Sequence, residues 1–142
     1  MSRLDPKERI KLALRTEAPL SEELLERLRN PKLIRILHAA QGLATEAGEI
    51  MDAVKKHIFY GKPLDEVNLK EEMGDVDWYQ SILCDALGTT MKEIEEANIK
   101  KLATRYGDKF SEDRAILRDL DRENVVLQQH LGVQQTIGVQ KN

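Results

Sequence analysis

The segment from Pro31 to about Tyr60 constrains the fold of this 142-residue chain more than any other feature. It begins at Asn30-Pro31 and runs to Tyr60-Gly61, and a helix of such length is typical of a helical bundle. The good helix formers Leu, Ala, Glu and Lys carry most of the chain, aromatic residues are only 4%, and no window alternates strictly over the length of a strand. The sequence therefore predicts an all-α protein.

Capping and stop signals divide the rest of the chain into further helices. The expected elements are a short helix over residues 5–15, a helix from the N-cap Ser21, a long helix from Asn68 to Leu87, a long helix from Thr89 or Thr90 to Tyr106, and a fourth long helix that starts at Ser111 and covers "SEDRAILRDLDRENVVLQQHL". We expect one domain over residues 1–131, with its core at 31–124. The Gln-rich tail, 132–142, has no helical period, and we expect it to be disordered or laid across a neighbouring subunit, without contributing a metal ligand.

Charge and cysteine content argue against several classes of function. A net charge of -3 gives no general reason to bind nucleic acid or an acidic membrane surface. No segment reaches the roughly 18 apolar residues of a membrane span, and the N-terminus lacks the apolar core of a secretory signal. Cys84 is the only cysteine, which excludes an intramolecular disulfide and a four-thiolate zinc site. We expect a cytoplasmic protein, in the host cytoplasm if phage-encoded, with neither membrane nor nucleic acid as partner.

Small residues gather in the first long helix, in "AAQGLATEAGEI". Gly42 and Gly48 lie inside this helix, and each costs roughly 1 kcal/mol against alanine. Gly74 occupies a similar place in the next long helix, beside Asp75. Small side chains let another backbone come close, and tight helix packing alone could account for these glycines.

Two acidic pairs stand out against this background. Glu46 and Glu49 are three residues apart, as are Glu72 and Asp75 on the next long helix, so each pair lies on one helix face. The loop between the two helices is short, and we expect the helices to be antiparallel neighbours. Facing pairs would place the four carboxylates in one small volume, which is costly without cations and supplies the oxygen ligands that suit Mg²⁺ or Mn²⁺. Two ordinary solvent-exposed acidic faces are the alternative.

Three longer stretches resemble a known family. They are "HAAQGLATEAGEIMDAVKKHIFYGK", "EEMGDVDWY" and "NIKKLATRYGDKF". Together they are similar to the MazG-like all-α nucleoside triphosphate pyrophosphohydrolases, particularly single-domain members of phage and bacterial type, over about residues 33–124. The pattern E-x-x-E…E-x-x-D is weak alone; its separation, the G-D-x-x-W-Y continuation and the N-x-x-K-L-x-x-R-Y block make the resemblance specific.

The resemblance implies a fold, an activity and an assembly. The fold would be four-helix-bundle-like, and the subunits would form homodimers or tetramers. The activity would be Mg²⁺-dependent hydrolysis of a (d)NTP to the nucleoside monophosphate and pyrophosphate, for nucleotide-pool control, with Mn²⁺ as a substitute. The matching metal ligands are Glu46, Glu49, Glu72 and Asp75.

Other positions are candidates for catalysis and substrate binding. Glu71 adjoins the second acidic pair and could orient or deprotonate the attacking water, or it could simply be solvated. In the N-x-x-K-L-x-x-R-Y block, Lys101 and Arg105 would meet phosphate oxygens and Asn98 could bond sugar or base. The alternative there is a basic stripe paired with neighbouring acids.

Three further candidates have equally ordinary explanations. Trp78 could stack on the base or belong to the core. His38 could line the nucleoside pocket or be a packed histidine. Lys56 could contact phosphate, or it could form an i,i+4 ion pair with Asp52.

Two rival functions stay open at this point. One is hydrolysis of another diphosphate-containing compound, and the other is a non-catalytic helical interaction protein with an inert acidic face. The sequence does not specify the base or sugar of a nucleotide substrate.

Overall fold

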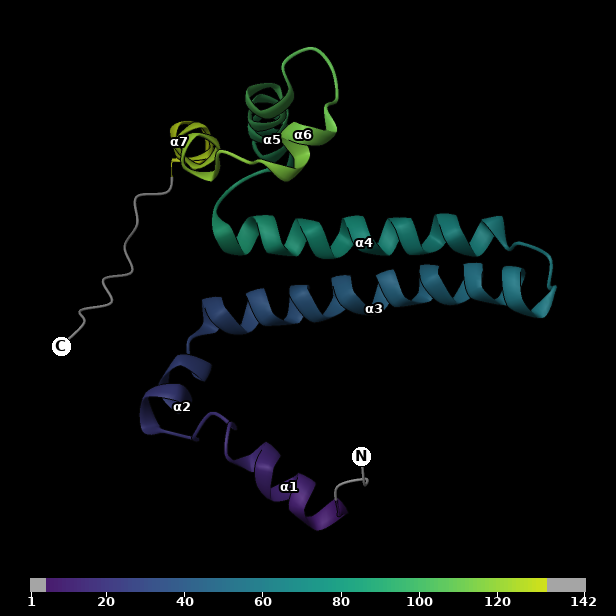
Figure 1. The fold of residues 1–142 in the computed structure, drawn as a ribbon, viewed down its shortest axis with the longest axis vertical. Helices are drawn as coiled ribbons and strands as arrows, with labels where there is room; N and C mark the ends of the chain where they lie inside the picture. Colours follow the sequence, from purple (N-terminus) through teal and green to yellow (C-terminus); the bar gives the residue numbers. More distant parts are fainter. Residues whose placement is uncertain (1–4, 133–142) are drawn as a thin grey trace. The chain divides into compact units, whose positions relative to one another are not determined.

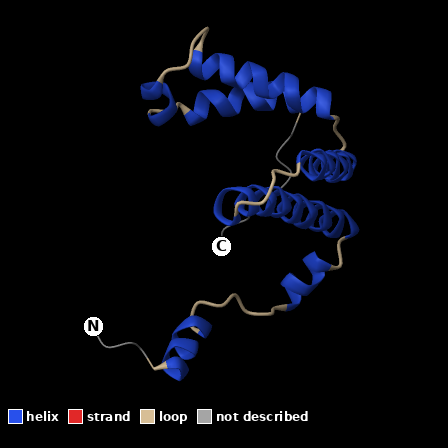
Figure 2. Cartoon of the chain, turned by 90° about the vertical axis from the view of Figure 1, so that its right-hand side faces the viewer, coloured by secondary structure: helices blue, strands red, loops and turns tan. Residues whose placement is uncertain are grey.

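The computed structural model describes residues 5–132, and this part of the chain contains helices and loops but no strand (Figures 1 and 2). The all-α prediction is confirmed. The helices are α1 (Pro6–Leu14), α2 (Glu22–Leu28), α3 (Pro31–Tyr60), α4 (Glu66–Leu87), α5 (Met91–Tyr106), α6 (Glu112–Ile116) and α7 (Leu120–Leu131). The expectations for the tail 132–142 fall almost wholly outside the described residues.

Most helix boundaries lie where the capping signals predict them. Ser21 accepts from the backbone N–H of Leu24, and Thr90 forms a capping box with Glu93. Gly88 ends α4 in the left-handed conformation, with φ of 72°, which a residue with a Cβ rarely adopts.

The prediction that Asn68 caps the second long helix is wrong by one turn. Asp65 is the N-cap of α4, and its side chain accepts from the backbone N–H of Asn68 at 3.0 Å. An aspartate outcompetes the later asparagine here because its carboxylate also complements the positive end of the helix dipole. The side-chain amide of Asn68 is consequently free for another role.

The prediction of one continuous fourth helix from Ser111 is also wrong. The chain leaves α6 at Leu117, where ψ is 72°, and starts α7 only after Asp119. Asp119 is itself an N-cap, accepting from the backbone N–H of Arg122 at 3.0 Å. This second N-cap interrupts the predicted helix. Aspartate is unfavourable in a helix interior and favourable at an N-cap, where its side chain accepts from the first backbone N–H groups of a new helix.

The contacts divide the chain into two units, residues 1–34 and 35–142. The described part of the first unit contains α1, α2 and the first turn of α3. Neither α1 nor α2 buries any residue. Whether residues 1–131 act as one domain stays a prediction.

Within the second unit, α3 and α4 form an antiparallel hairpin. Along α3 from Arg35 to His38 and Gly42, the partners on α4 run backwards from Asp85 to Tyr79. Arg35 donates to Asp85 at 2.5 Å, and the His38 and Tyr79 rings meet edge to face at 5.8 Å. The Tyr79 ring also lies so close to Gly42 that a Cβ there would overlap it. The expectation that another backbone approaches these glycines is wrong: the neighbour of Gly42 is the side chain of Tyr79, and Gly48 and Gly74 have open space beside them.

A buried ion cluster joins α5 to α7. Arg105 donates two hydrogen bonds to Glu123, at 2.7 and 2.5 Å, and Arg118 donates a third at 2.7 Å. Only 3% of Glu123 is exposed. Hydrogen bonds from the two arginines lower the pKa of Glu123 to about 2, so it is ionised at neutral pH.

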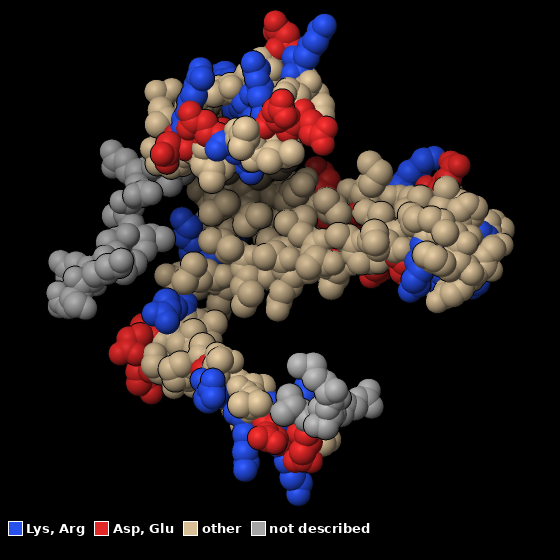
Figure 3. All heavy atoms as spheres, viewed as in Figure 1, with Lys and Arg blue, Asp and Glu red and all other residues tan. Residues whose placement is uncertain are grey.

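The core of the described chain is made of small residues. The buried apolar residues are Ala39, Ala53, Cys84, Ala86 and Ala97. Large apolar side chains remain exposed on α3 and α4, among them Met51 at 69%, Phe59 at 75% and Trp78 at 68%. The face of these helices turned to the viewer in Figure 3 carries few charged groups. Among the residues described, no helix is both long and apolar enough to cross a membrane.

Candidate metal centre

The antiparallel hairpin brings three of the predicted ligands together. One carboxylate oxygen from each of Glu46, Glu72 and Asp75 lies within 4.8 Å of the others. Glu46 comes from α3, and the other two come from one face of α4. The register explains the meeting: Gly42 faces Tyr79, and one helical turn further along, Glu46 on α3 meets Asp75 on α4.

Glu49 belongs to the same acidic neighbourhood. The negative charges of Glu72 and then of Glu46 raise the pKa of Glu49 above its ordinary value, with a smaller contribution from Asp75. A raised pKa means that the Glu49 carboxylate is close enough to these acids to be repelled by their negative charge. Glu49 therefore belongs to the same neighbourhood as the three residues that converge within 4.8 Å.

This arrangement fits a hard divalent cation. The donors are carboxylate oxygens on three or four side chains, which is the ligand type that Mg²⁺ and Mn²⁺ prefer. Glu72 is 4% exposed, and burying an ionised carboxylate beside other acids is costly unless a positive charge offsets it. A bound cation would remove that cost.

Glu72 is held by an amide from the preceding turn of α4. The Asn68 side chain donates to Oε1 of Glu72 at 2.7 Å. Glu46 receives a weaker contact from the Thr45 hydroxyl, at 3.2 Å. Sequence reasoning missed the amide because Asn68 was interpreted as a helix cap; its spacing of four residues from Glu72 was the available signal.

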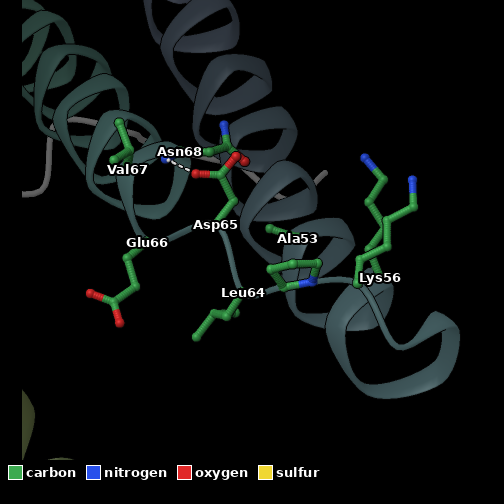
Figure 4. Close-up of a pocket in the computed structure, with 9 residues that line it drawn as sticks. Ala53, Lys56, Leu64, Asp65, Glu66, Val67 and Asn68 are labelled. Atoms are coloured by element: carbon green, nitrogen blue, oxygen red, sulfur yellow. Dashed lines mark hydrogen bonds between the residues drawn. The ribbon is translucent and has the colours of Figure 1, made fainter.

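A pocket of about 690 Å³ opens beside this end of the hairpin (Figure 4). Its wall includes Lys56 from α3, Lys62 and Asp65 from the loop, and Asn68 from α4. Asn68 thus touches the acidic group on one side and the pocket on the other. The pocket wall therefore carries two basic side chains together with Asn68, the residue that bonds to Glu72.

Lys56 has a partner on its own helix. It pairs with Asp52 at 2.6 Å, and Lys55 pairs with the same carboxylate. Hydrogen bonds from these lysines lower the pKa of Asp52 to about 2. The predicted i,i+4 pair is confirmed, and Lys56 remains half exposed at the pocket wall.

The remaining candidates near the cluster are placed differently. Glu71 is exposed, next to Glu72 in sequence but about 100° around the helix from it. Trp78 is not part of the core of the chain, because 68% of it is exposed. His38 is exposed, and its ring meets the Tyr79 ring edge to face.

The three candidates on α5 interact among themselves or with α7. Lys101 donates to Asn98 at 2.5 Å. The side chain of Arg105 is only 13% exposed and is committed to Glu123, a partner that the sequence analysis did not foresee. The structure brings the acidic residues together, and it places these three in a separate set of interactions. Their role in substrate binding stays a prediction.

The fold and the site define an all-α protein with a carboxylate cluster suited to a divalent cation. The family model described as MazG nucleotide pyrophosphohydrolase domain matches residues 36–110, just over half of the chain. The chain belongs to this family, and the resemblance seen in its sequence is confirmed. The match spans both acidic pairs and all of α4 and α5. Comparisons with curated proteins and with solved structures gave no match.

Proposed function

We propose that this protein hydrolyses a (deoxy)nucleoside triphosphate to the nucleoside monophosphate and pyrophosphate, with Mg²⁺, for nucleotide-pool control. The observation that supports this most strongly is the convergence of Glu46, Glu72 and Asp75 within 4.8 Å inside a MazG domain. Water adds across the anhydride bond between the α and β phosphates, and each product keeps a phosphate terminus.

The charges of the partners explain why a cation is needed. A triphosphate carries about four negative charges, and acidic side chains cannot hold it directly. The residues that would hold the metal are Glu46, Glu49, Glu72 and Asp75. When bound, Mg²⁺ neutralises phosphate charge, polarises the phosphoryl oxygen and lowers the pKa of coordinated water.

The chain's own groups would orient the reactants. Glu71, exposed beside Glu72, is our candidate for holding or deprotonating the attacking water. Lys56 and Lys62 line the wall of the 690 Å³ pocket and are our candidates for contacts with phosphate oxygens. Asn98, Lys101, Arg105, Trp78 and His38 remain candidates for the nucleoside and phosphates, and Arg105 would first have to release Glu123.

A panel of all canonical NTPs and dNTPs, each incubated with protein and Mg²⁺, tests this proposal. We expect pyrophosphate and the matching monophosphate from at least one nucleotide, and none in the presence of a chelator. Release of inorganic phosphate alone would indicate cleavage of a different bond. If no nucleotide in the panel released pyrophosphate but another diphosphate compound were hydrolysed, hydrolysis of that compound would be the favoured activity.

We further propose that the active form is a homodimer or a tetramer. Large apolar side chains on α3 and α4, including Met51, Phe59 and Trp78, are more than 60% exposed, while the buried apolar residues are alanines and a cysteine. A helical chain that leaves so much apolar surface in water is expected to cover it by association. A second copy offers a matching surface without any further partner.

Light scattering should therefore report at least twice the chain mass of 16.2 kDa at micromolar concentration. Phe59→Asp, which places a charge on the exposed apolar surface, should shift the protein toward smaller species. A wild-type mass equal to one chain across the accessible concentration range would reject the proposal.

A further inference from the structure

Among residues 5–132, Asn68 is the one neutral side chain that forms a hydrogen bond with Glu72, the buried acid of the cluster. Its amide nitrogen lies 2.7 Å from Oε1 of Glu72, and Asn68 itself is half buried. The two residues are four apart on α4, so they are stacked on one helix face. The bond engages Oε1 of Glu72 and restricts the rotation of its carboxylate.

The backbone of Asn68 is also held by a hydrogen bond. The backbone N–H of Asn68 donates to Asp65, the N-cap of α4, at 3.0 Å (Figure 4). This cap fixes the first turn of the helix, and with it the starting point of the Asn68 side chain. Asp65 therefore holds the backbone of Asn68, while the side chain of Asn68 bonds to Glu72.

An amide suits this position for reasons of charge. A lysine would pair with Glu72 and compete with a cation for it, and an aspartate would add a further negative charge beside three carboxylates that already converge within 4.8 Å. An amide donates a hydrogen bond and leaves the charge of the carboxylate unchanged. Groups that donate to metal-ligating carboxylates in this way keep the ligand in its binding orientation.

We propose that Asn68 is a positioning residue of the metal centre, which holds the carboxylate of Glu72 through its side-chain amide in the orientation that faces Glu46 and Asp75. This inference rests on the metal centre of the proposed function. Asn68 itself is not one of the proposed metal ligands.

The test measures Mn²⁺ affinity by electron paramagnetic resonance, without nucleotide. Asn68→Leu keeps the size of the side chain and the backbone N–H that Asp65 caps, but it removes the amide. We expect Mn²⁺ binding to weaken about 10–100-fold, the range typical for loss of a group behind a metal ligand. Asn68→Gln retains the donor and should recover most of the affinity. Asn124→Leu makes the same change at an exposed position on α7 and should bind Mn²⁺ like the wild type.

The outcomes separate this inference from the proposed function. Wild-type affinity in Asn68→Leu, or equal losses in Asn68→Leu and Asn68→Gln, would overturn the positioning role while leaving the metal centre intact. Failure of the wild type to bind Mn²⁺ would overturn the metal centre, and the inference with it.

Should Asn68→Leu fail to fold, nuclear magnetic resonance on the wild type decides the question. We expect the side-chain amide signals of Asn68 to shift in step with Mg²⁺ saturation. If Mg²⁺ shifted the backbone signals of Glu72 but left the side-chain amide signals of Asn68 unchanged, the positioning role would be overturned.

Discussion

Glu49→Gln and Asp75→Asn should each abolish nucleotide turnover while leaving helix content intact. Each change keeps the shape of the side chain and removes one negative charge from the cluster. Loss of a group behind a ligand already costs about 10–100-fold, so loss of a ligand should exceed about 100-fold. Initial rates at saturating nucleotide and millimolar Mg²⁺, with circular dichroism of the same samples, provide the measurement.

The melting temperature of the metal-free protein distinguishes removal of a charge from damage to the structure. The pKa of Glu49 is raised by Glu72 and Glu46, so the folded metal-free protein holds Glu49 against repulsion. Glu49→Gln should therefore raise the melting temperature of the metal-free protein and reduce the further increase that Mg²⁺ gives.

Asp77→Asn is the matched control, because Asp77 is an exposed acid on the same helix. It should leave both turnover and the response to Mg²⁺ unchanged. Near-normal turnover in both Glu49→Gln and Asp75→Asn would remove these residues from the metal centre.

Glu123→Gln should destabilise the protein more than any exposed charge substitution. Glu123 receives three hydrogen bonds from Arg105 and Arg118 and is only 3% exposed. Removing its charge leaves the largely buried Arg105 without a counter-ion, and breaking a buried pair on one side is costly. We expect the melting temperature to fall by about 10 °C or more.

Glu96→Gln is a suitable control on α5. Its contact with Lys92 is at 4.0 Å and exposed, and pairs of this kind contribute little. A melting temperature of Glu123→Gln within a degree or two of this control would show that the cluster does not hold α5 to α7.

The same cluster predicts how stability depends on pH. The pKa of Glu123 is about 2 in the folded protein, against an ordinary value of 4.5, so between these values the unfolded chain binds more protons. Its contribution to stability is therefore complete above about pH 4.5 and is lost as the pH falls toward 2. The difference in melting temperature between wild type and Glu123→Gln should shrink over that interval.

The features that the sequence predicted are those with local causes. Ser21 and Thr90 begin helices and Gly88 ends one, each through contacts within one turn. The ends of these helices could therefore be inferred without knowing the fold. The acidic pairs could also be inferred, since i,i+3 spacing and a short loop between two helices leave few other arrangements.

The features that the sequence did not predict depend on distant or competing contacts. The pairing of Arg105 with Glu123 spans eighteen residues and requires the chain to break after α6, where Asp119 starts a new helix. The role of the Asn68 amide was hidden by a competition between two capping residues, which Asp65 wins. Exposure of Trp78 could not be inferred either, because a large apolar residue in a helical chain is more often buried.

The contact between Gly42 and the ring of Tyr79 has a consequence for evolution at the neighbouring acids. Glu46 follows Gly42 by one helical turn, and Asp75 precedes Tyr79 by one turn. One turn from the acidic cluster, the ring of Tyr79 thus occupies space that a side chain at position 42 would need. Under the proposed metal centre, a larger residue at Gly42 would change the spacing of the ligands while every ligand remained in place, so selection on that centre would extend to a position that supplies no donor atom.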